Sequence, residues 1–171
     1  MTLAAPLALA LAACGDEQTF TVSNVDRAEV AEGEHEIDEV TFSENGDWIL
    51  VRVVLDSDGT GPCNEMGLGF CARDAGKKLT LRPEDPSVAS GKSAAPCTGD
   101  GYVPAAIHGS FSSYCGVVQT WTMTHADAQV DLDGDEAHVV LSGTLAQLQA
   151  SEGGFDVDVD VVATPVETEA E

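Results

Sequence analysis

The stretch Trp48-Ile-Leu-Val-Arg-Val-Val-Leu55 is the clearest strand of this chain. It is almost continuously apolar, rich in β-branched residues, and bounded by turn-forming residues at positions 45–47 and 56–59. This composition is typical of a strand in a protein core. Arg52 interrupts the run, so we expect a sheet edge or a carboxylate partner beside it.

A second pattern lies near the end of the chain, where the sequence from Phe155 to Val161 reads Phe-Asp-Val-Asp-Val-Asp-Val. Successive side chains of a strand point to opposite faces. We therefore expect the Phe and Val side chains to face a core, and Asp156, Asp158 and Asp160 to face water.

Other segments with strand character surround these two, at residues 19–25, 35–42, 79–81, 102–107, 117–125, 129–132 and 137–148. Asp133-Gly134 predicts a hairpin turn, and Ser142-Gly143 predicts a bulge. Residues 56–76 and 83–114 are expected to be mostly loop. About eight or nine short strands without a long amphipathic helix predict an all-β fold, either an antiparallel β-sandwich or an open barrel.

Four cysteines form an even set within the expected domain, at Cys63, Cys71, Cys97 and Cys115. In an exported protein such a set predicts two disulfides. Three connectivities are open, and the simplest joins neighbours, Cys63 with Cys71 and Cys97 with Cys115, because each pair encloses a Gly-rich loop. A zinc site is the alternative, but no pair has the C-x2-C or C-x4-C spacing that is common in such sites.

The fifth cysteine, Cys14, follows an apolar run over residues 3–13 that closes on Leu11-Ala-Ala. The run is too short to cross ~30 Å of hydrocarbon as a helix, so we interpret it as the core of a signal peptide. Leu-Ala-Ala-Cys resembles the lipobox of bacterial lipoproteins. The resemblance implies cleavage before Cys14, acylation of this cysteine with chains such as palmitate, and a position on the extracytoplasmic side of the cell envelope. Gly15 is compatible with sorting to the outer membrane.

One departure from this pattern is that residues 1–13 contain no Lys or Arg, whereas a signal peptide begins with basic residues. A translation start further upstream would explain the difference. A secretory signal without lipid, or a disordered apolar end, is the alternative interpretation of the segment.

The expected organisation has four parts: a signal peptide over residues 1–13, a lipidated tether over 14–18, a single β-domain over 19–164 and an acidic disordered tail over 165–171. Without the signal peptide, 158 of the 171 residues remain. That length is sufficient for one domain with its own hydrophobic core.

The chain is strongly acidic, with 30 Asp and Glu residues against 7 Lys and Arg and a formal net charge of −23. All seven basic residues lie between Arg27 and Lys92, and the residues after Lys92 include thirteen acids and no base. Such a surface repels nucleic-acid phosphates and anionic headgroups. We therefore expect no nucleic-acid partner, and diffuse binding of cations.

Two groups of carboxylates are weak candidates for metal ligands: Asp131, Asp133 and Asp135 around the predicted hairpin turn, and Asp156, Asp158 and Asp160 on the last strand. Calcium prefers several oxygen ligands in a defined loop. Neither the run from Asp131 nor the segment at residues 56–67 completes that pattern. No cofactor is predicted, and a calcium-binding module stays an alternative.

Candidate catalytic residues are sparse. The four histidines have no metal-binding spacing: His35, His108, His125 and His138. Ser110, Ser112 and Ser113 lie near His108, but no G-x-S-x-G elbow is present.

The leading hypothesis is therefore a lipid-anchored envelope protein that acts by binding or by structural association with an unidentified protein or small molecule. An anchored hydrolase with its site on the cysteine loops is the alternative, because a catalytic triad is gathered in space and not in sequence.

Overall fold

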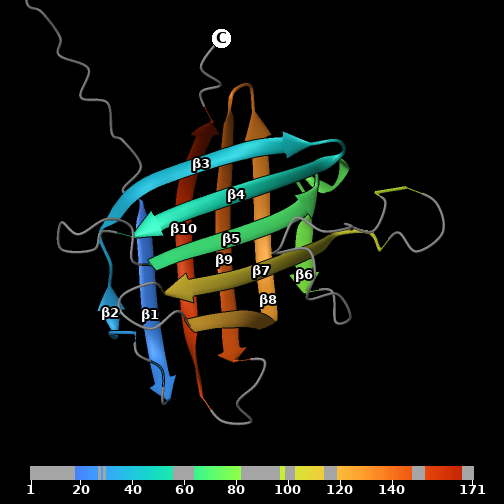
Figure 1. Cartoon of the computed structure of the whole chain (residues 1–171). Coiled ribbons are helices and arrows are strands. Elements are labelled where there is room, and N and C mark those ends of the chain that lie inside the picture. The colour runs from blue at the N-terminus through green and yellow to red at the C-terminus, as the bar shows by residue number, and fades with distance from the viewer. Residues whose placement is uncertain are drawn as a thin grey trace, which may run out of the picture.

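The computed structural model describes residues 18–26, 28, 30–55, 64–81, 97–98, 103–113, 119–147 and 153–166. These residues are almost entirely β, as the sequence predicts, and form one 10-stranded sheet folded into a barrel-like arrangement of two layers (Figure 1). The front layer contains β3 (Ile37–Asn45), β4 (Trp48–Leu55), β5 (Asn64–Cys71) and β7 (Ala106–Ser113). The rear layer contains β1 (Thr19–Asp26), β6 (Lys78–Leu81), β8 (Gln119–Asp133), β9 (Glu136–Gln147) and β10 (Gly154–Pro165). The two-residue strand β2 (Gly33–Glu34) pairs with β1, and a short 3-10 turn, η1 (Ala72–Asp74), follows β5.

Two junctions close the circuit of strands. On one side the end of β10 pairs in parallel with β3, Thr164 lying opposite Thr41. On the other side β8 first pairs with β7, and after an irregularity between Met123 and His125 it pairs with β6. The irregularity lets this single 15-residue strand belong to both layers (Figure 1).

The core lies between the layers and is centred on aromatic rings. The ring of Phe111 has its centroid 6.2 Å from that of Phe20, 5.8 Å from Trp121 and 5.2 Å from Phe155. These four side chains come from β7, β1, β8 and β10 and are at most 1% exposed. Contacts between strands distant in sequence therefore hold the two layers together.

The two clearest sequence patterns are confirmed. β4 begins at Trp48 and ends at Leu55, and its Arg52 has carboxylate partners within the sheet. In β10 the apolar residues from Phe155 to Val161 are buried, Asp158 and Asp160 are exposed, and Asp156, which the alternation also predicts to face water, is half-buried.

The expectation that residues 56–76 are mostly loop is wrong, because β5 runs through this segment in the middle of the front layer. Its side chains alternate, and Met66, Leu68 and Phe70 are buried in the core. Gly67 and Gly69 stand between them and obscure the alternation in the sequence.

The expected strand boundaries also need correction in the second half of the domain. The strand expected over residues 102–107 is β7, which instead begins at Ala106 and continues to Ser113. The two strands expected over 117–125 and 129–132 form the single strand β8.

The bulge lies in β8 and not at Ser142-Gly143, because Gly143 pairs regularly with Val157 of β10. A Cβ atom on Gly143 would lie 3.0 Å from the carbonyl oxygen of His125. Glycine therefore accommodates the irregularity of the neighbouring strand.

The disulfide joins Cys71 to Cys97, with a Cα–Cα distance of 5.7 Å, so the expected pairing of neighbouring cysteines is wrong. Cys63 is bonded to Asn64, the first residue of β5, and Cys71 is the last residue of the same extended strand. The two ends of such a strand are about 23 Å apart at ~3.3 Å per residue, far beyond the reach of a disulfide. Cys14, Cys63 and Cys115 lie outside the described residues.

In the described part of the chain, no helix has the length and apolar character needed to cross a membrane.

Candidate functional site

A hollow of about 230 Å³ lies on the outer face of the front layer, the face turned away from the core. Gly67 and Gly69 of β5 form its floor, β4 contributes Leu50 and Arg52, and β7 contributes His108. Glu65 lies toward one end and Val166 also lines the hollow. We call this hollow the β5 trough.

The register of the sheet explains why the trough exists. Gly69 lies between Leu50 and His108, and Gly67 lies between Arg52 and Ser110. The side chains of β4 and β7 therefore stand on either side of a strand that has none at these two positions on this face. From these two glycines the hollow continues past Leu50 and Arg52 to Thr41 and Ser43 of β3 and to Val166.

Gly67 is not required by the backbone or by its described neighbours. A Cβ atom there would meet Ser110 Oγ at 3.9 Å, an ordinary van der Waals distance, and the residue does not adopt a positive φ. Glycine within a strand costs roughly 0.5–1 kcal/mol relative to alanine and often marks a place where a ligand approaches the backbone. The open space above Gly67 is thus a property of the site and not a packing necessity.

Charged groups define one end of the trough. Arg52 Nη2 donates to Glu65 Oε2 at 3.0 Å, and Arg52 Nη1 donates to Glu39 Oε2 at 3.1 Å. The hydrogen bond with Glu65 is the main cause that raises the pKa of Arg52, with further support from the charges of both glutamates. One guanidinium between two carboxylates leaves this end with an excess negative charge.

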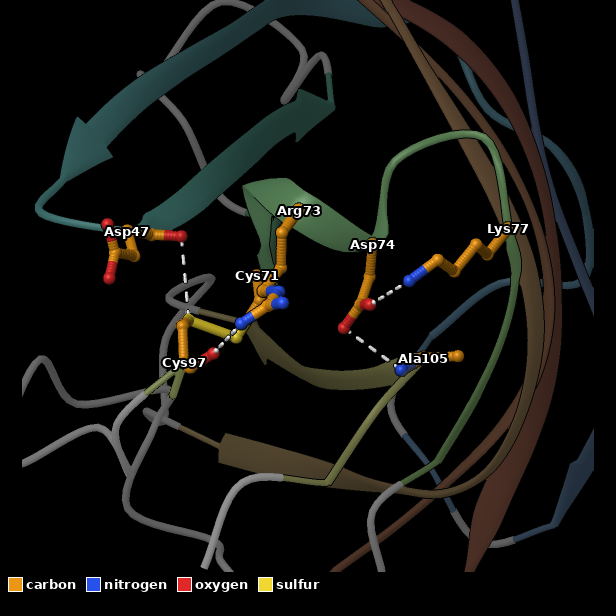
Figure 2. Close-up of a disulfide and its surroundings, with 7 residues drawn as sticks. All are labelled: Asp47, Cys71, Arg73, Asp74, Lys77, Cys97 and Ala105. Atoms are coloured by element: carbon orange, nitrogen blue, oxygen red, sulfur yellow. Dashed lines mark hydrogen bonds and ion pairs between the residues drawn. A yellow bond between two sulfur atoms is a disulfide. The ribbon is translucent and has the colours of Figure 1, made fainter. Parts of the chain in front are cut away.

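The disulfide lies on the same face beyond the other end of the trough, since Cys71 follows Gly67 and Gly69 at the same alternation along β5. Figure 2 shows its surroundings. Trp48, Cys71 and Cys97 form a small buried cluster, separate from the main core, and the Trp48 ring lies 5.8 Å from the ring of His108. Arg73 Nη1 donates to the carbonyl oxygen of Cys97 at 3.2 Å. These contacts fix the segment at Cys97 against the sheet.

Asp74 connects this region to the beginning of β7. Its side chain is fully buried and accepts hydrogen bonds from Lys77 Nζ at 2.8 Å and from the backbone N–H of Ala105 at 2.9 Å (Figure 2). Ala105 has φ of 54°, which an alanine rarely adopts. The carboxylate therefore holds an unfavourable backbone conformation just before the strand that carries His108.

The three serines near His108 lie on the same strand, β7. Ser110 Oγ lies over Gly67, Ser112 Oγ is 3.5 Å from Thr120 Oγ1, and Ser113 is buried. Glu65, the carboxylate that lines the trough, is held by Arg52. This arrangement does not resemble the nucleophile, base and acid of a hydrolase.

The aspartates of β10 lie on the outer face of the rear layer. Asp156 accepts from Asn24 Nδ2 and Thr144 Oγ1, both at 2.7 Å, and these bonds, that from Asn24 first, lower its pKa. Ser142 Oγ donates to Asp158, and His138 Nε2 lies 2.7 Å from Asp160 Oδ1.

Of the carboxylates of the β8–β9 hairpin, Asp131 lies opposite His138 and lines a shallow hollow together with Asp158 and Asp160. Asp131 accepts from Gln129 Nε2, and Asp133 and Asp135 are exposed at the turn. Across the described ranges, no three His, Cys, Asp or Glu residues are grouped so that they could hold a metal ion.

Sequence reasoning missed the trough because it placed β5 in a loop. The available signal was the period-two spacing of Met66, Leu68 and Phe70. Comparison of the chain with protein families, curated proteins and solved structures finds no match.

Proposed function

We propose that this chain is a lipoprotein of a bacterial cell envelope, anchored through Cys14 on the extracytoplasmic side, whose β-domain binds a partner or small molecule in the β5 trough. The observation that carries the binding role is the open space over Gly67, a strand glycine that neither its backbone nor its described neighbours require. Ligand sites are typically concave and largely apolar, with a few convergent polar groups. The trough combines Leu50 and Val166 with Arg52, Glu65 and His108.

The proposed location outside the cytoplasm is supported by the Cys71–Cys97 disulfide, since such bonds persist in oxidising compartments. The lipobox-like sequence before Cys14 supports the anchor. Two or three acyl chains, at ~0.8 kcal/mol per buried methylene, would hold the domain stably on a membrane. The outer membrane is the favoured location.

The anchor is tested by Cys14→Ser in the full-length protein expressed in a bacterial host. We expect the wild type to fractionate with membranes and to carry an acyl mass, and the variant to lose both. A variant that still sediments with membranes, beside a wild type without an acyl mass, would show the lipobox interpretation to be wrong.

The binding role is tested by capture of partners from the native envelope with the tethered protein, comparing the wild type with Gly67→Val. Valine fills the trough and suits a strand, so we expect the variant to keep its melting temperature and lose the bound material. Thr21→Val, on the outer face of the rear layer, is the matched control and should retain it. Equal capture by all three proteins would exclude the trough as the site.

A further inference from the structure

We propose that the β5 trough recognises an aliphatic chain ending in a cationic group, a primary ammonium or a guanidinium, which bonds to Glu65. This inference rests on the proposed binding role of the trough and adds the chemical class of the ligand. Three features of the site carry it: its size, its apolar walls and the sign of charge at its end.

Size restricts the ligand to a small group. The hollow of about 230 Å³ is below the roughly 300–1,000 Å³ of sites for drug-sized molecules. A group as large as one long side chain suits this volume. The glycine floor also favours a slender chain, because the side chains of Leu50 and His108 flank Gly69 on either side.

Charge decides between a cation and an anion. Arg52 lies between Glu39 and Glu65 and donates to both, so the three groups together carry one net negative charge, which favours a cation over an anion. A cation would approach Glu65, whose Oε2 accepts from Arg52 and whose side chain is 31% exposed, against 51% for Glu39. The more buried carboxylate, in the less polar surroundings, is the stronger partner for a cation.

Long-range electrostatics act in the same direction. The chain carries a formal charge of −23, which raises the local concentration of cations and the rate at which they arrive. The apolar wall at Leu50 and Val166 would contact the methylene groups of the ligand, as it would the stem of a lysine.

The test uses three probes of equal length, pentylammonium, 1-pentanol and pentanoate, added to the folded domain, with amide NMR shifts as the readout. We expect saturable shifts at Gly67 and Gly69 that are strongest for pentylammonium. Affinity for 1-pentanol should be weaker by about tenfold, since hydrogen bonds to charged groups contribute more than neutral ones. Glu65→Gln should reduce pentylammonium binding to the level of 1-pentanol, and Gly67→Val should remove all binding at these amides.

Equal binding of pentylammonium and 1-pentanol, or stronger binding of pentanoate, would overturn the cationic preference while leaving the trough as a binding site. Absence of any shift at Gly67 and Gly69 with all three probes would also overturn the proposed cationic ligand. Capture of envelope partners that depends on Gly67 would even then support the proposed function. The source of the cation is tested with two further probes. Nα-acetyl-lysine methylamide, which keeps its ε-ammonium group, mimics a protein side chain, and 1,5-diaminopentane represents a free small molecule. Tighter binding of either probe supports the cationic class and identifies the source.

Discussion

Two aspartate–lysine pairs with similar distances differ in their surroundings. Asp74 lies 2.8 Å from Lys77 and is fully buried, whereas Asp127 lies 3.0 Å from Lys78 and is 46% exposed. Burial makes an unsatisfied polar group costly, and exposure lets water replace a lost partner. The same chemical pair therefore has different consequences at the two positions.

We expect Asp74→Ala to lower the free energy of unfolding by about 2–3 kcal/mol, because the N–H of Ala105 loses its carboxylate acceptor at a strained position. Asp127→Ala is the matched control and should cost less than about 1 kcal/mol. Urea unfolding measures both. Similar losses of unfolding free energy for the two variants would show that burial does not determine how much Asp74 contributes to stability.

Strand β10 shows how one element separates two environments. It pairs with β9 along its length, with β1 over its first part and with β3 at its end, so its inward face is covered by the core. Val157 is 1% exposed, and the neighbouring Asp158 is exposed and accepts from Ser142.

Val157→Asp should unfold the domain, since an unpaired buried carboxylate costs several kcal/mol, comparable with the whole stability of a small domain. Asp158→Asn should leave the thermal melt nearly unchanged because its side chain stays in water and still accepts a hydrogen bond. Circular dichroism melts compare the variants. A stable Val157→Asp protein would mean that the register of β10 is misassigned.

The pairing of β5 with β7 bears on the two remaining cysteines of the domain. Asn64 lies opposite Ser113 in the ladder, Cys63 precedes Asn64, and Cys115 is two residues beyond Ser113. Since Cys71 is bonded to Cys97, a second disulfide in the domain would join Cys63 to Cys115.

We expect mass spectrometry of the exported protein, digested without reductant, to find Cys63 linked to Cys115 and Cys71 linked to Cys97, with no thiol labelled among the four. Reduction should destabilise the fold, since the Cys71–Cys97 loop of 26 residues alone contributes about 3.5 kcal/mol in the chain-entropy account. Stoichiometric labelling of Cys63 and Cys115 would refute the second bond.

The distribution of charge gives the protein a dependence on its ionic surroundings. The formal charge is −23, and the thirteen acids after Lys92 have no basic residue near them in sequence. In the described part of the rear layer, Asp156 and Asp158 accept hydrogen bonds from neutral side chains and Asp160 lies beside His138. Repulsion among such carboxylates is relieved by mobile cations more than by fixed partners.

Salt should therefore raise the melting temperature, with sodium and potassium equally effective at the same ionic strength. Calcium at sub-millimolar concentration, added at constant ionic strength, should produce no further shift. Melting curves at low salt separate the two effects. A saturable shift seen with calcium alone would identify a specific metal site, because ligand binding stabilises by mass action.

Local sequence patterns were sufficient for the properties that depend on neighbouring residues. The apolar run at Trp48–Leu55 and the alternation from Phe155 to Val161 predicted two strands and supported a β fold. In the second strand the alternation also predicted the buried Phe and Val side chains and the exposed Asp158 and Asp160. Arg52 was expected to lie at a sheet edge or beside a carboxylate, since a charged group within an apolar strand requires compensation, and the structure shows the second.

Only the tertiary structure decided which distant segments meet. β5 was hidden because Gly67 and Gly69 weaken its pattern, and the same two glycines create the trough once β4 and β7 stand on either side. The partner of Cys71 likewise follows from the extension of β5, which separates it from Cys63. Alternation along a strand is a local property of the backbone, whereas the pairing of strands is settled by burial of a shared core, to which residues far apart in the sequence contribute together.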